Sequence, residues 1–246
     1  MTLLAHVSDL HLDGSEHATS RARKVACYLN GLERRLDAVV ITGDIAEHGL
    51  ATEYEEAREL FGGLPHTLMC PGNHDRRPAF WSALLGQEAS EAPINQSLWL
   101  DGLVIAMCDT SIPGRDDGYL TDDTLAWLSG VLAQTPADMR VLIALHHPPA
   151  ILHSPFVDEI RQQGEERLAE LIAGSGRVTA VLCGHAHTAA ATTFAGLPVL
   201  VAPGVVSTLR LPWEGAGDLD KQMPPAIAFH VIDDGGRITT HYRVAP

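Results

Sequence analysis

Short apolar runs recur along the chain, and most of those in the first 190 residues end in a polar side chain. Five of these runs lead into Asp9 with His11, Asp44, Asn73, His146, and His185 with His187. Runs of this length that are rich in β-branched residues are typical of buried strands. In layered α/β folds, side chains beyond the carboxyl ends of neighbouring strands gather at one edge. The pattern therefore predicts a mixed α/β fold with these polar side chains collected in one place.

Amphipathic segments separate the apolar runs. We expect helices over residues 17–36, 51–64, 121–133 and 165–174. The last part of the chain instead resembles strands joined by tight turns, such as Asp-Asp-Gly-Gly at 233–236. Mixed βα units followed by hairpins suggest α/β layers around two sheets, formed by a single domain over residues 1–246.

The charge balance narrows the choice of partners. The chain has 31 acidic residues against 17 lysines and arginines, a formal net charge of −14. This charge disfavours long nucleic acids and anionic membranes as partners. No apolar run approaches the roughly 20 residues of a membrane span, and no basic leader precedes Asp9. The four cysteines show no CxxC spacing, so we expect a cytoplasmic protein without disulfides.

Each polar strand end has an ordinary explanation when it is taken alone. Asp9 and Asp44 could form turns or cap helices, and His11 could be a satisfied polar residue. The two spaced pairs, Asp9-x-His11 and His185-x-His187, carry more weight. Residues i and i+2 of an extended segment point the same way, so each pair could converge on one ligand. Two such pairs together with the other strand ends favour a functional cluster.

The donor types in this cluster suit metal ions. Carboxylate, imidazole and amide oxygen without any thiolate are suited to Mn²⁺, Fe or Zn²⁺. Seven donors are too many for one ion with an open position. They suit two ions that share a bridging carboxylate, as in two-metal phosphoryl chemistry.

The blocks resemble those of the calcineurin-like metallophosphoesterase superfamily. They are Asp9-Leu10-His11, Gly43-Asp44, Gly72-Asn73-His74-Asp75, His146 and Gly184-His185-Ala186-His187. The surrounding segments HVSDLHL, VVITGDIAEHG and ALHHPP are similar to the branch of class III cyclic nucleotide phosphodiesterases and glycerophosphodiesterases. The resemblance implies a four-layer αββα sandwich. Members of this branch are often dimers, so a homodimer is one expectation.

The resemblance also implies roles for individual residues. One metal ion would be held by Asp9, His11, His187 and Asp44. The other would be held by Asp44, Asn73, His146 and His185. Asp44 would bridge the ions, Asn73 and His74 would contact the substrate, and a metal-bound hydroxide would attack the phosphorus. His74 would act on the phosphate as a proton donor or electrostatic stabiliser rather than as a ligand.

Several further residues have open roles. Arg21 and His48 could line the substrate pocket or be ordinary surface residues. Asp75 could cap the following helix or orient His74, and His147 is expected to give structural support. We expect Gly72 to permit a sharp backbone turn.

Three functions stay open at this point. The chain could open 3′,5′- or 2′,3′-cyclic nucleotides, or hydrolyse glycerophosphodiesters and other small mono- or diesters. It could also be a metal-bound scaffold without turnover, although the complete donor set and His74 argue against this. The substrate is in each enzymatic case a small molecule.

Overall fold

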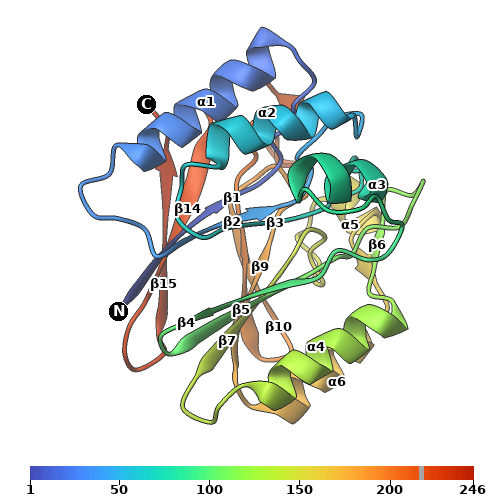
Figure 1. Cartoon of the computed structure of the whole chain (residues 1–246), viewed down its shortest axis with the longest axis vertical. Coiled ribbons are helices and arrows are strands. Elements are labelled where there is room, and N and C mark those ends of the chain that lie inside the picture. Colours follow the sequence, from blue (N-terminus) through green and yellow to red (C-terminus); the bar gives the residue numbers. More distant parts are fainter. Residues whose placement is uncertain (216–218) are drawn as a thin grey trace.

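Two β-sheets form the centre of the molecule (Figure 1), which is described here from a computed structural model covering residues 1–215 and 219–246. The first sheet has the order β15 (Ile238–Val244), β14 (Ala226–Ile232), β1 (Thr2–Val7), β2 (Ala38–Thr42) and β3 (Thr67–Cys70). The second has the order β10 (Ala190–Phe194), β11 (Leu197–Val201), β9 (Val178–Cys183), β7 (Arg140–Leu145), β5 (Leu103–Cys108) and β4 (Gln96–Leu100).

Parallel pairing brings the important strand ends together. Strands β1, β2 and β3 run parallel in the first sheet, as do β5, β7, β9 and β11 in the second. Hairpin strands lie at the margins, where β14 and β15, β4 and β10 pair antiparallel with their neighbours. The carboxyl ends of the parallel strands in each sheet therefore share one edge.

Helices cover the outer faces of both sheets (Figure 1). The first sheet is covered by α1 (Glu16–Asn30), α2 (Ala51–Phe61), α3 (Arg77–Ala79) and the π-helical turn Phe80–Leu84. The second is covered by α4 (Asp122–Gln134) and α6 (Glu165–Ser175). The inner faces pack on each other through residues such as Leu4, Ile105 and Leu182. The four-layer αββα arrangement expected from the sequence is thereby confirmed.

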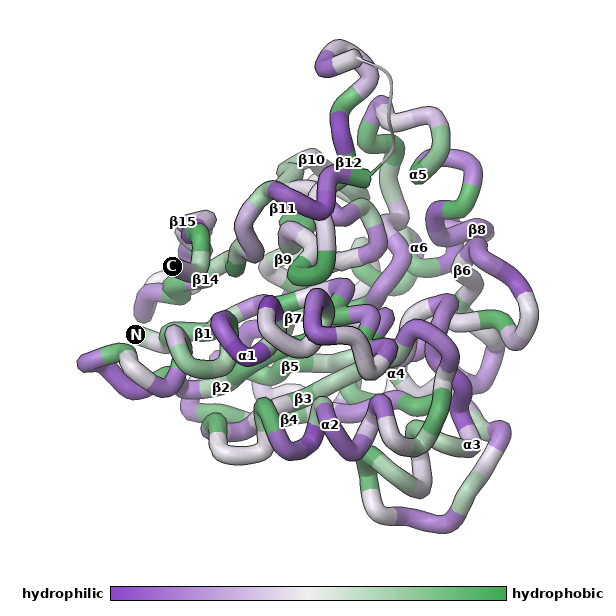
Figure 2. Tube along the Cα trace, turned by 90° about the horizontal axis from the view of Figure 1, so that it is seen from above, coloured by the Kyte–Doolittle hydropathy of each residue, from purple (hydrophilic) through white to green (hydrophobic). Residues whose placement is uncertain are grey.

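Local sequence explains where the helices begin and end. The Ser15 side chain accepts a hydrogen bond from the Ala18 N–H at the start of α1, and Thr121 does the same for Thr124 at the start of α4. The first helix ends six residues earlier than expected, because its C-cap is Gly31. Figure 2 shows hydrophilic and hydrophobic residues alternating along α1 and α2, as expected for helices that cover a core with one face.

Short elements surround the edge where the strands end. They are β6 (Gly118–Tyr119), α5 (Pro155–Glu159), β8 (Gln162–Gln163), β12 (Thr208–Leu209) and β13 (Leu219–Asp220). All four cysteines are free thiols, three of them buried. Among the described residues, the helices are all too short or too polar to span a bilayer.

Candidate metal centre

The structure brings all seven predicted donors to the facing edges of the two sheets. The first sheet supplies Asp9, His11, Asp44 and Asn73, which follow β1, β2 and β3. The second supplies His146, His185 and His187, which follow β7 and β9. All except Asn73 are buried.

The backbone at five of these donors adopts the left-handed conformation. Their φ angles are 56° for Asp9, 44° for His11, 48° for Asp44, 67° for His185 and 48° for His187. Non-glycine residues seldom adopt this conformation, and those that do cluster at functional sites. The expectation that the two spaced pairs converge because they are extended is therefore wrong. The donors are aimed by tight turns directly after the strands, and His185 and His187 enter different groups.

A first group of donors converges from His11, His187, Asp44 and Asp9. The Nε2 atoms of His11 and His187 lie 3.1 Å apart. His11 Nε2 is also 3.4 Å from Asp44 Oδ2, and His187 Nε2 is 3.6 Å from Asp9 Oδ1. Such close approach of two imidazole nitrogens and two carboxylates is the arrangement that a bound cation would stabilise.

A second group also includes Asp44. His146 Nε2 lies 3.2 Å from Asn73 Oδ1, 3.2 Å from His185 Nδ1 and 3.4 Å from Asp44 Oδ2. Asp44 thus takes part in both groups through the same oxygen. The two groups share one carboxylate, which is the arrangement a bridged pair of ions requires.

Hydrogen bonds behind the imidazoles orient three of the rings. Nδ1 of His146 donates to the Thr42 carbonyl oxygen at 2.6 Å, so Nε2 is the ring nitrogen that faces the cluster. Nδ1 of His187 faces the Ser207 hydroxyl at 2.9 Å, and Nδ1 of His11 faces the Glu47 carboxylate at 2.5 Å. Such support of the distal nitrogen is typical of metal-binding histidines.

Two buried polar atoms at the centre are left without partners. Asp9 Oδ2 and His185 Nε2 make no hydrogen bond to any part of the chain that the structure describes. Buried polar atoms are rarely orphaned, because an unmade hydrogen bond costs about 1–3 kcal/mol. Together with the converging nitrogens, the orphaned carboxylate oxygen shows that these residues fit cations.

The charges of the centre agree with that fit. Burial by itself would raise the pKa of Asp44, but His146 and His11 hold that pKa well below its usual range. Burial opposes protonation of His146, yet Asp44 outweighs it and raises the pKa of His146 to about 9. Burial lowers the pKa values of His185 and His187, which leaves these imidazoles neutral at pH 7. His185 and His187 therefore have the neutral state that a metal ligand needs, whereas the proton that Asp44 holds on His146 would be released when a cation binds.

His74 lies beside the donors and is partly exposed. Its N–H donates to Asp44 Oδ1 at 3.0 Å, and its side chain is 37% exposed. Nδ1 of the ring donates to the Glu47 carbonyl oxygen at 3.1 Å, which leaves Nε2 as the ring nitrogen that is not bound to Glu47. Glu47, which the sequence did not single out, therefore contacts both His11 and His74. No motif spacing pointed to Glu47.

Of the two roles offered for Asp75, capping the following helix is wrong. The N-cap of α3 is Arg76, which makes no side-chain capping bond. The buried Asp75 carboxylate instead accepts from the N–H groups of Gly72, Ile45 and Ala46, so it joins the turn after β3 to the turn after β2. Burial, and after it the charge of Asp44, raise the pKa of Asp75 to about 6.

Gly72 serves a purpose different from the one expected. Its φ lies outside the left-handed region, but a Cβ at this position would overlap Asp44 Oδ1 and crowd His146 Nε2. The residue is small because two donors occupy the space of its side chain, and not because the turn is sharp.

Arg21 and His48, which the sequence offered as possible pocket residues, form hydrogen bonds with other parts of the chain. The buried Arg21 side chain donates to the carbonyl oxygens of Val205, Lys221 and Met223, so it anchors the chain around β12 and β13. His48 points to Glu53, with its Nδ1 2.8 Å from that carboxylate. Neither residue lines the pocket described below.

His147 also lies behind the donor groups. Its Nδ1 is 2.8 Å from the Thr110 hydroxyl oxygen, and its Nε2 donates to the Asp116 carbonyl oxygen at 3.1 Å. Both ring nitrogens therefore have protein partners, as structural support requires.

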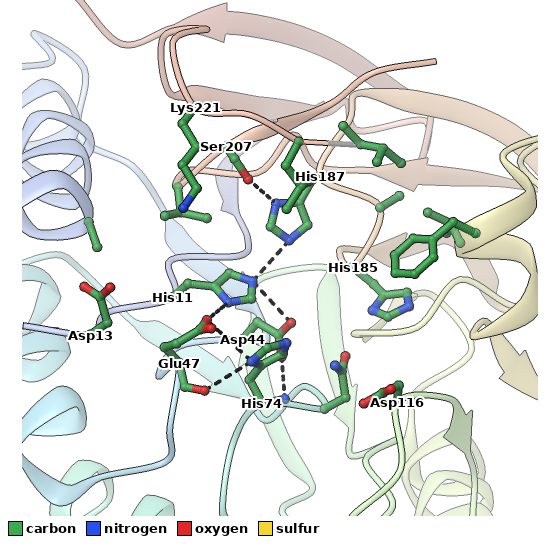
Figure 3. A pocket seen from close by; sticks show the side chains of 18 of the residues that line it. His11, Asp13, Asp44, Glu47, His74, Asp116, His185, His187, Ser207 and Lys221 are labelled. Atoms are coloured by element: carbon green, nitrogen blue, oxygen red, sulfur yellow. Dashed lines mark hydrogen bonds and ion pairs between the residues drawn. The ribbon is translucent and has the colours of Figure 1, made fainter. Parts of the chain in front are cut away.

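A cavity of about 610 Å³ opens onto both donor groups and His74. Figure 3 shows Lys221 and Ser207 on one side of His11, and His74 on the other. Among the described residues that line the cavity, Lys221 is the single lysine or arginine. It lies in the loop-rich segment after β13, where the sequence carries no recognisable pattern. The cavity thus combines a donor cluster, a histidine and one cationic side chain.

Comparisons with known proteins agree with this geometry. A family model described as calcineurin-like phosphoesterase matches residues 2–189. The chain is 34% identical over 225 residues to a probable cyclic nucleotide phosphodiesterase of Rhodococcus erythropolis, covering 87% of this chain and 74% of that protein. It is 31% identical over 240 residues to the glycerophosphodiester phosphodiesterase GpdQ of Enterobacter lignolyticus, covering 93% and 86%. A dimetal phosphatase structure from Danio rerio shares the fold, with a TM-score of 0.71, 14% identity and coverage of 100% and 96%.

Proposed function

Because the chain belongs to the calcineurin-like phosphoesterase family, we propose that it is a two-metal phosphodiesterase that hydrolyses a small phosphodiester. The observation that carries the proposal is the placement of Asp44. One of its oxygens lies 3.4 Å from His11 Nε2 in one donor group and 3.4 Å from His146 Nε2 in the other. A carboxylate shared in this way is what two neighbouring ions need.

The two donor groups would each hold one ion. Asp9, His11, Asp44 and His187 would bind the first, and Asp44, Asn73, His146 and His185 the second. Imidazole, carboxylate and amide oxygen suit Mn²⁺, Fe or Zn²⁺. Bound ions would supply Lewis acidity and neutralise the charge of the phosphate. We also infer that residues 1–246 act as one domain, because each group takes donors from both sheets.

The chain itself would supply proton transfer and orientation. His74 has its Nδ1–H engaged by the Glu47 carbonyl oxygen, so its ring is fixed with Nε2 available. When protonated, Nε2 would donate its proton to the leaving alcohol oxygen. Lys221, a positive charge in a protein of net charge −14, would attract the anionic diester to the cavity.

A cyclic nucleotide, either 3′,5′-cyclic AMP or a 2′,3′-cyclic nucleotide, is the substrate that we favour. The relative from Rhodococcus erythropolis is named as a probable cyclic nucleotide phosphodiesterase, and the match to it has the higher identity of the two described above. Glycerophosphodiesters are the second candidate, because the relative from Enterobacter lignolyticus is a glycerophosphodiester phosphodiesterase.

Hydrolysis of bis(p-nitrophenyl) phosphate by protein reconstituted with Mn²⁺ tests the activity. We expect turnover that is abolished by a chelator and restored by added metal. A panel of cyclic nucleotides and glycerophosphodiesters, compared by kcat/KM, then tests the substrate. Metal-loaded protein that hydrolyses no diester would refute the proposal in favour of a scaffold without turnover.

A further inference from the structure

One wall of the cavity is apolar and includes an exposed aromatic side chain. Phe156, on α5, lines the cavity with 64% of its surface exposed. Ile160 continues this wall just beyond α5, and Leu219, which is 49% exposed, lines the same cavity from β13. Large apolar side chains left open to water inside a cavity gain from contact with an apolar ligand.

The segment that carries Phe156 is fixed at several points. Val157, the next residue, is buried and packs into the core beside the second sheet. The Asp158 carboxylate accepts from the Leu152 N–H at 2.7 Å, and the Gln162 N–H donates to the Pro148 carbonyl oxygen at 3.1 Å. The exposed ring is therefore held by an ordered support, so its placement costs a ligand little reorganisation.

The other side of the apolar wall is joined directly to the donor cluster. Leu209 pairs with Leu219 between β12 and β13. The Leu209 N–H donates to the carbonyl oxygen of His187 at 3.0 Å. A group attached to a phosphate at the donors would therefore be within the same cavity as Phe156 and Leu219.

We propose that Phe156, Ile160 and Leu219 form a subsite that selects phosphodiesters whose alcohol carries a flat ring, such as a nucleobase or an aryl group. This inference rests on the proposed diesterase activity and adds the residues that decide its specificity. A ring could stack on Phe156 and cover Leu219, whereas a polyol such as glycerol would leave both side chains wet.

A selectivity ratio tests the subsite. We compare kcat/KM of metal-loaded protein for a ring-bearing diester, the preferred cyclic nucleotide or bis(p-nitrophenyl) phosphate, with that for glycerophosphoethanolamine, which has no ring. Phe156→Ala should lower kcat/KM for the ring-bearing diester by on the order of tenfold. The value for glycerophosphoethanolamine should change less than twofold. Phe156→Trp, which keeps a ring, should retain the selectivity.

A binding measurement separates this subsite from the metal chemistry. Adenosine has a base but no phosphate, so it can report on the subsite in metal-free protein. Of the two substitutions compared, Phe156→Ala and Ile151→Ala, only Phe156→Ala should weaken its binding. Saturation-transfer NMR should show contact of the adenine ring with the wild-type protein, no contact with Phe156→Ala, and none for ribose. Ile151→Ala, which removes an exposed side chain of the same segment outside the cavity, is the matched control and should behave as wild type.

Two results would overturn the inference. One is an equal loss of kcat/KM for both diesters in Phe156→Ala, with unchanged adenosine contact. The other is a change in oligomeric state with unchanged selectivity, which would assign Phe156 to an interface between copies of the chain. In either case normal metal-dependent hydrolysis by the wild-type protein would leave the proposed diesterase activity standing.

Discussion

His11 and His146 both approach the same oxygen of Asp44, each with Nε2 at 3.4 Å. Removal of this carboxylate by Asp44→Ala should therefore weaken both donor groups. We expect the variant to lose at least one of the two ions, as measured by metal analysis after gel filtration. Asp116→Ala, which removes an acidic pocket residue outside both groups, should keep its metal. A fully loaded and active Asp44→Ala protein would refute the shared carboxylate.

His74→Ala should separate catalysis from metal binding. The His74 ring lies 4.6 Å from the His11 ring, centroid to centroid, but it belongs to neither group that includes Asp44. We expect metal content near that of the wild type and a fall in kcat of roughly 100-fold, since a proton donor is lost. Metal analysis and steady-state kinetics on the same sample decide the question, and loss of metal would contradict the assignment.

Tyr54→Phe tests the bonds that hold the turn containing Asn73 and His74. The buried Tyr54 hydroxyl donates to Asp75 Oδ1 at 3.0 Å and accepts from the Arg76 N–H at 2.8 Å. Its loss should lower the free energy of unfolding by about 1–3 kcal/mol, measured by urea denaturation. Tyr28→Phe, in a partly buried ring of the same hydrophobic cluster, should change it by less than about 0.5 kcal/mol. Equal effects of both substitutions would contradict the bracing role of Tyr54.

Acid should destabilise the protein through a histidine pair between the sheets. His6 Nδ1 lies 3.0 Å from His230 Nε2, and burial lowers the pKa of His230 to about 3. Because the unfolded chain binds this proton near pH 6.5, the stabilisation is complete above pH 6.5 and is lost as the pH falls towards 3. The expected slope is about 1.4 kcal/mol per pH unit for one such histidine.

His230→Gln provides the comparison that isolates this effect. Urea denaturation at pH 7 and pH 5 should show that the wild type loses more stability on acidification than the variant does. An equal loss in the two proteins would show that His230 binds its proton as readily in the folded chain as in the unfolded chain, which would contradict the lowered pKa.

The sequence located the donors because each follows an apolar strand, and the sheets then gather them. It gave the wrong reason for the paired donors, since Asp9 and His187 adopt left-handed backbone rather than extended backbone. Such backbone angles depend on hydrogen bonds between one turn and another. The Asp9 N–H, for example, donates to the Gly43 carbonyl oxygen in the turn after β2. Spacing within one segment does not reveal bonds of that kind.

Residues outside the strand ends were harder to predict. Glu47 and Lys221 have no distinctive spacing, and they reach the pocket because β2 and the chain around β13 are placed there. Arg21 looked available for substrate, yet its guanidinium is used by three carbonyl oxygens. Its partners lie 184 to 202 residues away in the chain, beyond the reach of any local pattern.

Each donor group takes side chains from both sheets, and this couples catalysis to the packing between them. Leu4 and Leu182 lie in the layer where the sheets meet, and neither lines the pocket. A cavity or an extra methyl group there would shift one set of donors against the other. Inherited or engineered variation in this hidden layer would therefore appear first as altered metal retention, in a protein whose pocket residues are all unchanged.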